Sequence, residues 1–348
     1  MPEGATLSVL DCGPATSIQD TGRFGLQRYG VGPAGAMDRD ALTIANLLVG
    51  NDPQEAALEF AGIGGRFRVE TGQIRLALYG AGAILSVEGE PVDAATSITV
   101  SAGDQITVGP TRRGMFAMLA LAGGLALEPV LGSRSLHQRS GIGGIDGRAL
   151  HAGDMLILRE AEPRGEDLML VDPPAPADGP IRVLLGPQDD YFTEEAIAAF
   201  FDNTYSVSQQ ADRMGYRLNG PAIPHRDGFN IVSDGIVTGS VQIPGSGEPI
   251  VLMADRQTTG GYPKIATIIT ADLARFAQKR PGEPVRFTAV SREDAIAAAR
   301  SRALMLETLH EQLMPAGALD LSSTRLLGLN LVGGMVDANA DFFPQEGF

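Results

Sequence analysis

Polar side chains stand among many glycines in residues 17–38, SIQDTGRFGLQRYGVGPAGAMD. Gln19, Arg23 and Asp38 are side chains in this segment that could contact or act on a ligand. An arginine guanidinium binds a carboxylate or phosphate through two hydrogen bonds, and a carboxylate can act as a general base. Glycine costs roughly 0.5–1 kcal/mol in regular structure, so a dense run marks turns or a close approach of the backbone. The segment is either a spacer between strands or a binding loop, and its residues leave both interpretations open.

Asp38 has two interpretations of its own. Apolar residues follow it at helical spacing as far as Val49, and Gly50 supplies a stop signal. Aspartate is a preferred N-cap, so this pattern predicts a helix that begins after Asp38. The same carboxylate is a candidate general base, and both roles stay open.

Three clusters in the second half repeat the combination of glycines and polar side chains. They are QQADRMGYRLNG at 209–220, SDGIVTGSVQIPGSGEP at 233–249 and ADRQTTGGYPKIA at 254–266. Arg213, Arg217 and Arg256 could each grip an anion through the planar guanidinium. Three such clusters in one chain favour a binding site over a purely structural role.

Two carboxylates have competing assignments. Asp255 beside Arg256 is a candidate catalytic group, or half of a local ion pair worth ~0–1 kcal/mol on the surface. Glu59 stands at the start of an apolar strand, where it is either a carboxylate with a raised pKa or the partner of a nearby arginine.

Composition excludes several kinds of protein. The net charge of −15 argues against a nucleic-acid partner, because phosphate binding needs a basic surface. One cysteine and four scattered histidines offer no metal-ligand spacing, so we expect no metal site. Lys264 and Lys279 stand neither in a Walker A loop nor in a Met-Lys context that would carry biotin. The chain shows neither a signal peptide nor a membrane span, so we expect a cytoplasmic protein that does not bind membranes.

Short apolar runs such as RFRVE, QIRLALY and MFAMLAL predict a mainly β chain with a few helices. Helices are expected after Asp38, after Thr193, over 270–280 and over about 292–313, and Asp52-Pro53 resembles a further helix start. An acidic and then proline-rich stretch before 180 is the best domain boundary. We predict domains at 1–174 and 175–313, with a C-terminal tail at 314–348 that packs back on them.

At these clusters the sequence resembles a known family. The segment 17–38 followed by ANLLVGN and LEF matches its N-terminal signature, and GPQDDYF, DRMGYRLNG, SDGIVTGSVQIP, ADRQTTGGYPKIATI and LLGLNLVGG follow in the expected order. The family is the biotin-dependent carboxyltransferase-like group, also called allophanate hydrolase subunit 2 or KipA. The resemblance spans nearly the whole chain.

The resemblance implies two cyclophilin-like β-barrel domains and an ATP-dependent 5-oxoprolinase. In such an enzyme this type of subunit acts with a KipI-type chain and a LamB/YcsF-type chain to open a small cyclic amide to glutamate. It also implies two alternatives: carboxyl transfer from biotin on another chain to urea or a similar amide, and a non-enzymatic regulator that binds a kinase inhibitor. ATP would be a co-substrate of the complex, and this chain would carry no covalent biotin.

We expect the site to lie between the two domains, with Asp38 and Asp255 as catalytic carboxylates. The expected substrate-binding residues are Gln19, Arg23, Asn46, Arg213, Arg217, Gln242, Arg256, Gln257, Thr258 and Tyr262. Phosphorylation or carboxylation of an amide builds negative charge, which arginines and preorganised amides stabilise. Arg23 is expected to be an exposed loop residue, so its removal should leave folding almost untouched.

Overall fold

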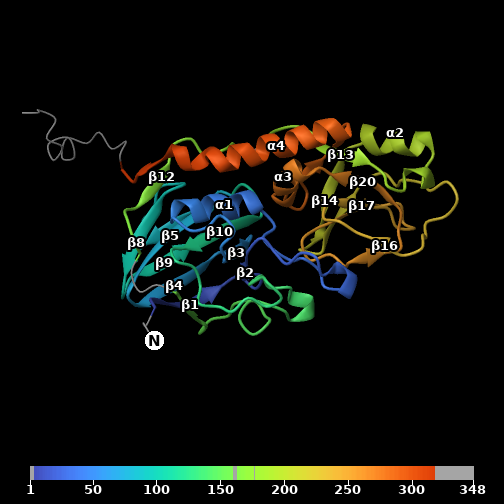
Figure 1. The fold of residues 1–348 in the computed structure, drawn as a ribbon. Helices are drawn as coiled ribbons and strands as arrows, with labels where there is room; N and C mark the ends of the chain where they lie inside the picture. The colour runs from blue at the N-terminus through green and yellow to red at the C-terminus, as the bar shows by residue number, and fades with distance from the viewer. Residues whose placement is uncertain (1–3, 160–162, 176, 318–348) are drawn as a thin grey trace, which may run out of the picture.

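The computed structural model describes residues 4–159, 163–175 and 177–317 and shows a mainly β protein (Figure 1). The prediction of a mainly β chain with few helices is confirmed. The described residues contain four α-helices: α1 (Arg39–Leu48), α2 (Glu194–Asp202), α3 (Leu273–Ala277) and α4 (Arg292–Thr308).

The first half of the chain forms two antiparallel sheets. One has the order β11-β1-β4-β9-β6-β7, from β1 (Thr6–Cys12), β4 (Gly65–Thr71), β6 (Leu85–Val87), β7 (Glu90–Pro91), β9 (Gln105–Val108) and β11 (Met155–Ile157). The other has the order β2-β3-β10-β5-β8, from β2 (Ser17–Gln19), β3 (Ala57–Ala61), β5 (Gln73–Tyr79), β8 (Ser97–Ser101) and β10 (Phe116–Leu121). Their apolar faces enclose one core.

Strand patterns show how this half is layered. In β4, Phe67 and Val69 are buried while Arg66 and Arg68 are exposed, the alternation of a strand with one wet face. Every residue of β10 is buried instead. Alternate residues of β10 face the core between the sheets, and the others face α1, which covers the outer side of this sheet (Figure 1). The helix therefore makes β10 a strand with two buried faces.

The second half forms one eight-stranded sheet that nearly closes on itself. Its order is β21-β14-β15-β18-β17-β20-β13-β22. The strands are β13 (Ile181–Leu185), β14 (Tyr205–Ala211), β15 (Gly215–Asn219), β17 (Ser240–Gln242), β18 (Ile250–Leu252), β20 (Lys264–Ile268), β21 (Pro284–Val285) and β22 (Phe287–Ala289). The two edge strands, β21 and β22, are separated in the chain by Arg286 alone, so the sheet curls into a barrel around its own core. This barrel agrees with the fold that the family resemblance implies.

Capping residues mark the helix starts as the sequence predicts. The Asp38 carboxylate accepts a hydrogen bond from the Ala41 amide at 2.9 Å, and Thr193 caps α2 in the same way at 3.2 Å. The helix near the C-terminus ends at Thr308 and continues as a 3₁₀ turn to Gln312. The expectation at Asp52 is wrong, because its carboxylate caps a turn at Gln54 and no helix follows.

Helix α4 links the two halves. It runs from the barrel across to α1, where Arg302 pairs with Asp40 (Figure 1). The chain then returns to the first half, where β23 (Leu313–Pro315) pairs with β12 (Leu168–Leu170). The domain boundaries stay a prediction, and most of the expected tail, 318–348, lies outside the described residues. Within the described ranges, no helix combines the length and apolar character that crossing a bilayer requires.

Candidate active site

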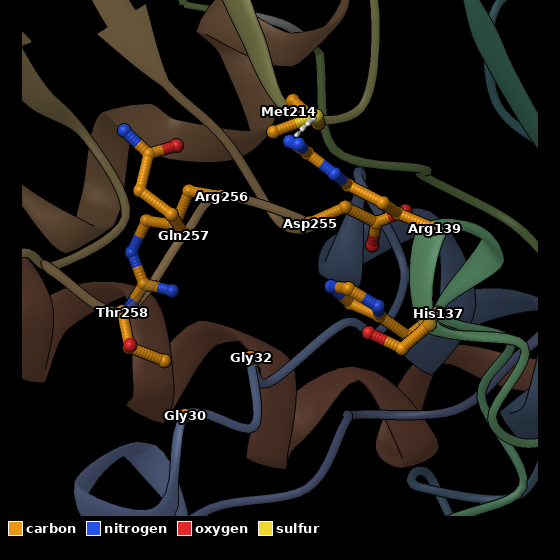
Figure 2. A pocket seen from close by; sticks show the side chains of 10 residues that line it. Gly30, Gly32, His137, Arg139, Met214, Asp255, Arg256, Gln257 and Thr258 are labelled. Atoms are coloured by element: carbon orange, nitrogen blue, oxygen red, sulfur yellow. Dashed lines mark hydrogen bonds between the residues drawn. The ribbon is translucent and has the colours of Figure 1, made fainter.

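A pocket of about 340 Å³ lies where the two halves meet (Figure 2). The first half contributes the glycine-rich loop after β2 and the turn η2 (Gln138–Ser140) with the residue before it. The second half contributes the β14–β15 turn and the segment after β18. The lining residues are Gly30, Gly32, His137, Arg139, Ser140, Met214, Asp255, Arg256, Gln257 and Thr258. The segment 254–266, which the sequence singles out, therefore supplies four consecutive residues of the wall.

Arg256 places a buried cation in the pocket wall that pairs with no carboxylate among the described residues. Its side chain is buried, with 4% of the residue exposed, and Nε and Nη1 find no partner among the described residues. Burial, and then the nearby Arg39, lower the pKa of Arg256 to about 10, so it is still a cation at neutral pH. A buried cation without a carboxylate is costly, and an anionic ligand would relieve that cost.

The Asp255 carboxylate forms its ion pair with Arg213 and not with Arg256. Arg213 donates to it from Nη2 at 2.9 Å and from Nε at 3.0 Å. The predicted alternative of a pair between Asp255 and Arg256 is therefore wrong, since the carboxylate is held by Arg213. Asp255 therefore lines the pocket with both carboxylate oxygens engaged.

Arg213 bridges the two halves instead of lining the pocket. It also pairs with Glu59 of β3 and donates to the Gly35 carbonyl at 2.7 Å. Burial acts to lower the pKa of Arg213, but the two carboxylates outweigh it and raise the pKa. Burial, and then repulsion from the nearby Asp255 carboxylate, keep the pKa of Glu59 above its usual range, although Arg213 acts to lower it. Glu59 is therefore both a carboxylate with a raised pKa and the partner of an arginine, Arg213.

Arg23 is buried, which corrects the expectation of an exposed loop residue. Only 2% of it is exposed, and Nη2 donates to the Ser135 carbonyl while Nη1 has no partner among the described residues. Gln19 is buried beside it and donates to the Leu136 carbonyl at 3.1 Å. Both side chains hold the segment before η2 against β2, and neither lines the pocket.

The glycine-rich loop is folded on itself. Gly22 and Gly35 both have positive φ, and a Cβ at Gly22 would lie 2.7 Å from the Pro33 carbonyl oxygen. A Cβ at Gly35 would lie 2.8 Å from the Thr21 carbonyl oxygen. These two glycines therefore allow the loop to close, whereas Gly30 and Gly32 line the pocket.

Asp38 and Asn46 are engaged in the fold and do not line the pocket. Asp38 caps α1 with one oxygen and accepts from Gln278 with the other, at 2.6 Å. Burial raises the pKa of Asp38 to about 6. Asn46 donates to the Glu55 carbonyl at 2.8 Å and accepts from Asn51, which fixes the end of α1.

Of the other residues expected to bind substrate, two line the pocket and three lie outside it. Gln257 and Thr258 line the pocket. Gln242 is buried and donates to the Tyr262 carbonyl at 3.4 Å, while the Tyr262 side chain is partly exposed outside the pocket. Arg217 points outward from β15 into solvent.

Sequence reasoning missed the contribution of His137, Arg139 and Met214. Figure 2 shows His137 across the pocket from the Arg256 guanidinium, with Gly32 between them. Met214 lies in the glycine-flanked cluster 209–220. For His137 and Arg139 the local signal is their position ahead of the glycine-rich turn GIGGIDG, and nothing in that spacing points to Arg256. Among the residues that the structure describes, no group of three or more His, Cys, Asp or Glu could hold a metal ion.

Comparison with known families agrees with the sequence motifs. The family model for the carboxyltransferase domain, subdomain A and B, matches residues 29–289. The chain belongs to this family. The family resemblance that the motifs indicated is therefore confirmed.

Individual relatives span the chain. It is 38% identical over 316 residues to the 5-oxoprolinase C subunit of Escherichia coli (strain K12), covering 87% of this chain and 97% of that protein. It is 36% identical over 305 residues to the 5-oxoprolinase C subunit of Haemophilus influenzae, with the same coverage. Among solved structures, the K. lactis urea amidolyase matches with a TM-score of 0.81 and 28% identity, over 92% of this chain and 21% of that one.

Proposed function

We propose that this chain is a subunit of an ATP-dependent 5-oxoprolinase, which opens a small cyclic amide to glutamate. The observation that carries the proposal is the alignment with two 5-oxoprolinase C subunits over 97% of their length. The match to urea amidolyase covers only 21% of that chain, so most of urea amidolyase has no counterpart in this chain.

The pocket suits the chemistry of amide activation. An amide carbonyl is stabilised by resonance, so it reacts only after charge moves onto oxygen or away from nitrogen. Phosphorylation by ATP does the first, and the phosphoryl oxygens and the substrate carboxylate are anions. The uncompensated Arg256 cation is placed to bind one of these anions, and Gln257 and Thr258 add polar contacts at the same wall.

The proposal includes partners. The relatives in Escherichia coli and Haemophilus influenzae are each one subunit of a 5-oxoprolinase, and therefore a component of a larger enzyme. We expect a KipI-type chain and a LamB/YcsF-type chain to complete this one, with activity only in the assembled complex.

Carboxyl transfer to urea is the second candidate. The fold match to urea amidolyase favours it. In that case a biotin carried by another chain would enter the same pocket, because neither lysine of this chain lies in a biotin-acceptor context.

Reconstitution separates the two candidates. The chain is purified alone and with both partner chains, and glutamate formation from 5-oxoproline and ATP is measured beside carboxylation of urea with a biotinylated carrier. We expect glutamate from the complex only. Turnover by the isolated chain, or a complex that carboxylates urea and leaves 5-oxoproline unchanged, would overturn the proposal.

A further inference from the structure

His137 is buried in the pocket wall without a hydrogen-bond partner for its ring. Only 6% of the residue is exposed, and neither Nδ1 nor Nε2 is bonded among the described residues. Its backbone is well held, since its amide donates to the Ile142 carbonyl at 2.8 Å. A buried polar group left without a partner costs roughly 1–3 kcal/mol. Such a ring in a pocket wall is a candidate for contact with a ligand.

The ring faces the space beside Arg256. A Cβ placed on Gly32 would lie 3.0 Å from His137 Nε2 and 3.1 Å from the Arg256 carbonyl oxygen. The absence of a side chain at Gly32 therefore lets Nε2 and the Arg256 backbone lie on either side of one narrow gap, in which both ring nitrogens are buried. Figure 2 shows the ring on one side of this gap and the Arg256 side chain on the other.

The charged groups around the ring come from three elements. Arg139 follows on η2, and Asp255 and Arg256 face it from the segment after β18. Arg23, from the loop after β2, contacts the neighbouring Ser135 carbonyl. The surroundings are thus mostly cationic, and the one carboxylate among them is already bound by Arg213.

His137 is the pocket group whose ring nitrogens find no partner among the described residues and can accept a proton. A neutral imidazole carries one acceptor nitrogen. Asp255 is engaged by an arginine, and Asp38 is engaged by the helix end and by Gln278 and does not line the pocket. The two predicted carboxylate bases are therefore less available than this histidine.

We propose that His137 takes the N–H proton of the amide substrate as that amide is activated, an inference that rests on the proposed function. The N–H bond breaks and its proton passes to a ring nitrogen of His137. The released electron pair forms a C=N bond, the carbonyl oxygen bonds the γ-phosphorus of ATP, and ADP leaves. Arg256 stabilises the charge that develops on oxygen during this step.

The same proton must leave in the alternative reaction. When an amide nitrogen takes a carboxyl group from carboxybiotin, its N–H electron pair forms the new N–C bond, and the N–C bond of carboxybiotin breaks with its electron pair left on the biotin nitrogen. The amide proton again needs an acceptor, from which it can pass to that biotin nitrogen. The role of His137 can therefore be tested even where the choice of 5-oxoproline is wrong.

The kinetic test compares His137→Gln and His137→Asn with His310→Gln in the reconstituted complex. His310 is an exposed histidine outside the pocket, so its variant should match the wild type. We expect the His137 variants to lose at least about 100-fold in kcat with a small change in KM, as for removal of a general base. They should also lose the fall in kcat/KM toward acid pH that protonation of a base causes. Activity within a few-fold of wild type, or an unchanged acid limb, would overturn the proposal.

A binding test needs no turnover. The chain has four histidines, so their ring signals can be separated by NMR, and that of His137 is assigned by its absence in His137→Gln. Adding 5-oxoproline should shift the His137 signal saturably and leave that of His310 in place. If neither 5-oxoproline nor urea moves the His137 signal, the proposal is wrong.

The two proposals fail in different ways. A complex that carboxylates urea and ignores 5-oxoproline overturns the proposed function, and the His137 variants are then measured with urea. A complex that opens 5-oxoproline equally well with glutamine at 137 overturns only the role of His137.

Discussion

At the scale of single residues, the pairing of buried polar groups separates the candidates. Asp255 and Arg213 were both expected in the site, and the structure pairs them with each other. Arg256 and His137 line the pocket and are also buried, but they carry buried nitrogens that find no partner among the described residues. Residues that bond one another hold the fold, whereas residues left without partners have hydrogen-bonding capacity to offer a ligand.

Replacing Arg256 should separate activity from stability. Arg256→Met removes a buried cation that has no carboxylate partner among the described residues, so we expect a melting temperature equal to or above that of the wild type. Activity of the complex should fall at least tenfold, about 1.4 kcal/mol of barrier. Arg217→Met, at an exposed arginine outside the pocket, serves as the control and should change neither quantity. A parallel loss of stability and activity in Arg256→Met would show a structural role.

Asp38 should make stability depend on pH. Burial raises its folded-state pKa to about 6, so between about pH 4 and 6 the folded protein binds an extra proton relative to the unfolded chain. Its contribution to stability is present at lower pH and is lost as the pH rises to about 6. Asp38→Asn keeps a capping oxygen but cannot ionise. Between about pH 4 and 6 its free energy of unfolding should therefore rise by about 2 kcal/mol relative to that of the wild type.

Urea denaturation at several pH values measures this difference. The amide of asparagine would face the Gln278 amide nitrogen, which adds an offset that does not vary with pH. Asp52→Asn is the control, because Asp52 is exposed and also accepts a backbone hydrogen bond. Parallel stability curves for Asp38→Asn and wild type would contradict the prediction.

At the scale of elements, one arginine joins strand β3 to the turn after β14 and to the segment after β18. Arg213 reaches Glu59, which is 154 residues away in the chain, and Asp255, 42 residues away. The bridge fixes the segment that carries Arg256 against the first half. A substrate-binding role was expected for Arg213 from its residue type and its glycine-flanked cluster, whereas its contacts in the structure are with Glu59, Asp255 and the Gly35 carbonyl.

Removing this bridge should be costly. Arg213→Met leaves two buried carboxylates without their cation, which typically costs 3–5 kcal/mol. We expect a correspondingly lower free energy of unfolding by chemical denaturation. The triple variant Arg213→Met, Glu59→Gln, Asp255→Asn removes the uncompensated charges and should recover part of the loss. A single variant as stable as wild type would show that the carboxylates are compensated in another way.

At the scale of the whole molecule, the two halves share a core and a hydrogen-bonded contact. Met37 and Phe116 of the first half belong to the apolar cluster of the barrel. Gln278, just after α3, accepts from the Met115 and Phe116 amides at 2.8 and 2.9 Å and donates to Asp38. The pocket therefore depends on how firmly the halves hold each other.

The halves should unfold together. We expect wild-type protein to show one calorimetric transition, since a shared core makes separate unfolding unfavourable. Gln278→Ala leaves two backbone amides without acceptors and should lower the free energy of unfolding by about 2 kcal/mol or more. Gln210→Ala, at an exposed glutamine of β14, is the control. Two separated transitions in the wild-type protein would contradict this prediction.

The sequence by itself determined the features that depend on neighbours in the chain. Asp38 before an apolar helical pattern located α1, alternating strands such as β4 indicated a mainly β fold, and ordered motifs indicated the family. Each is a local signal, because caps, alternation and motifs act over a few residues. The segment 254–266 was also identified from sequence as part of a site.

Only the tertiary structure decided which of those polar residues face a common space. His137 and Arg256 lie in different halves and meet across Gly32, which no spacing in the sequence encodes. Arg23 was expected to be an exposed residue of the glycine-rich loop, yet it is buried by the segment before η2. Burial and pairing arise from contacts between distant segments, so a residue's local surroundings predict its chemistry but not its partner.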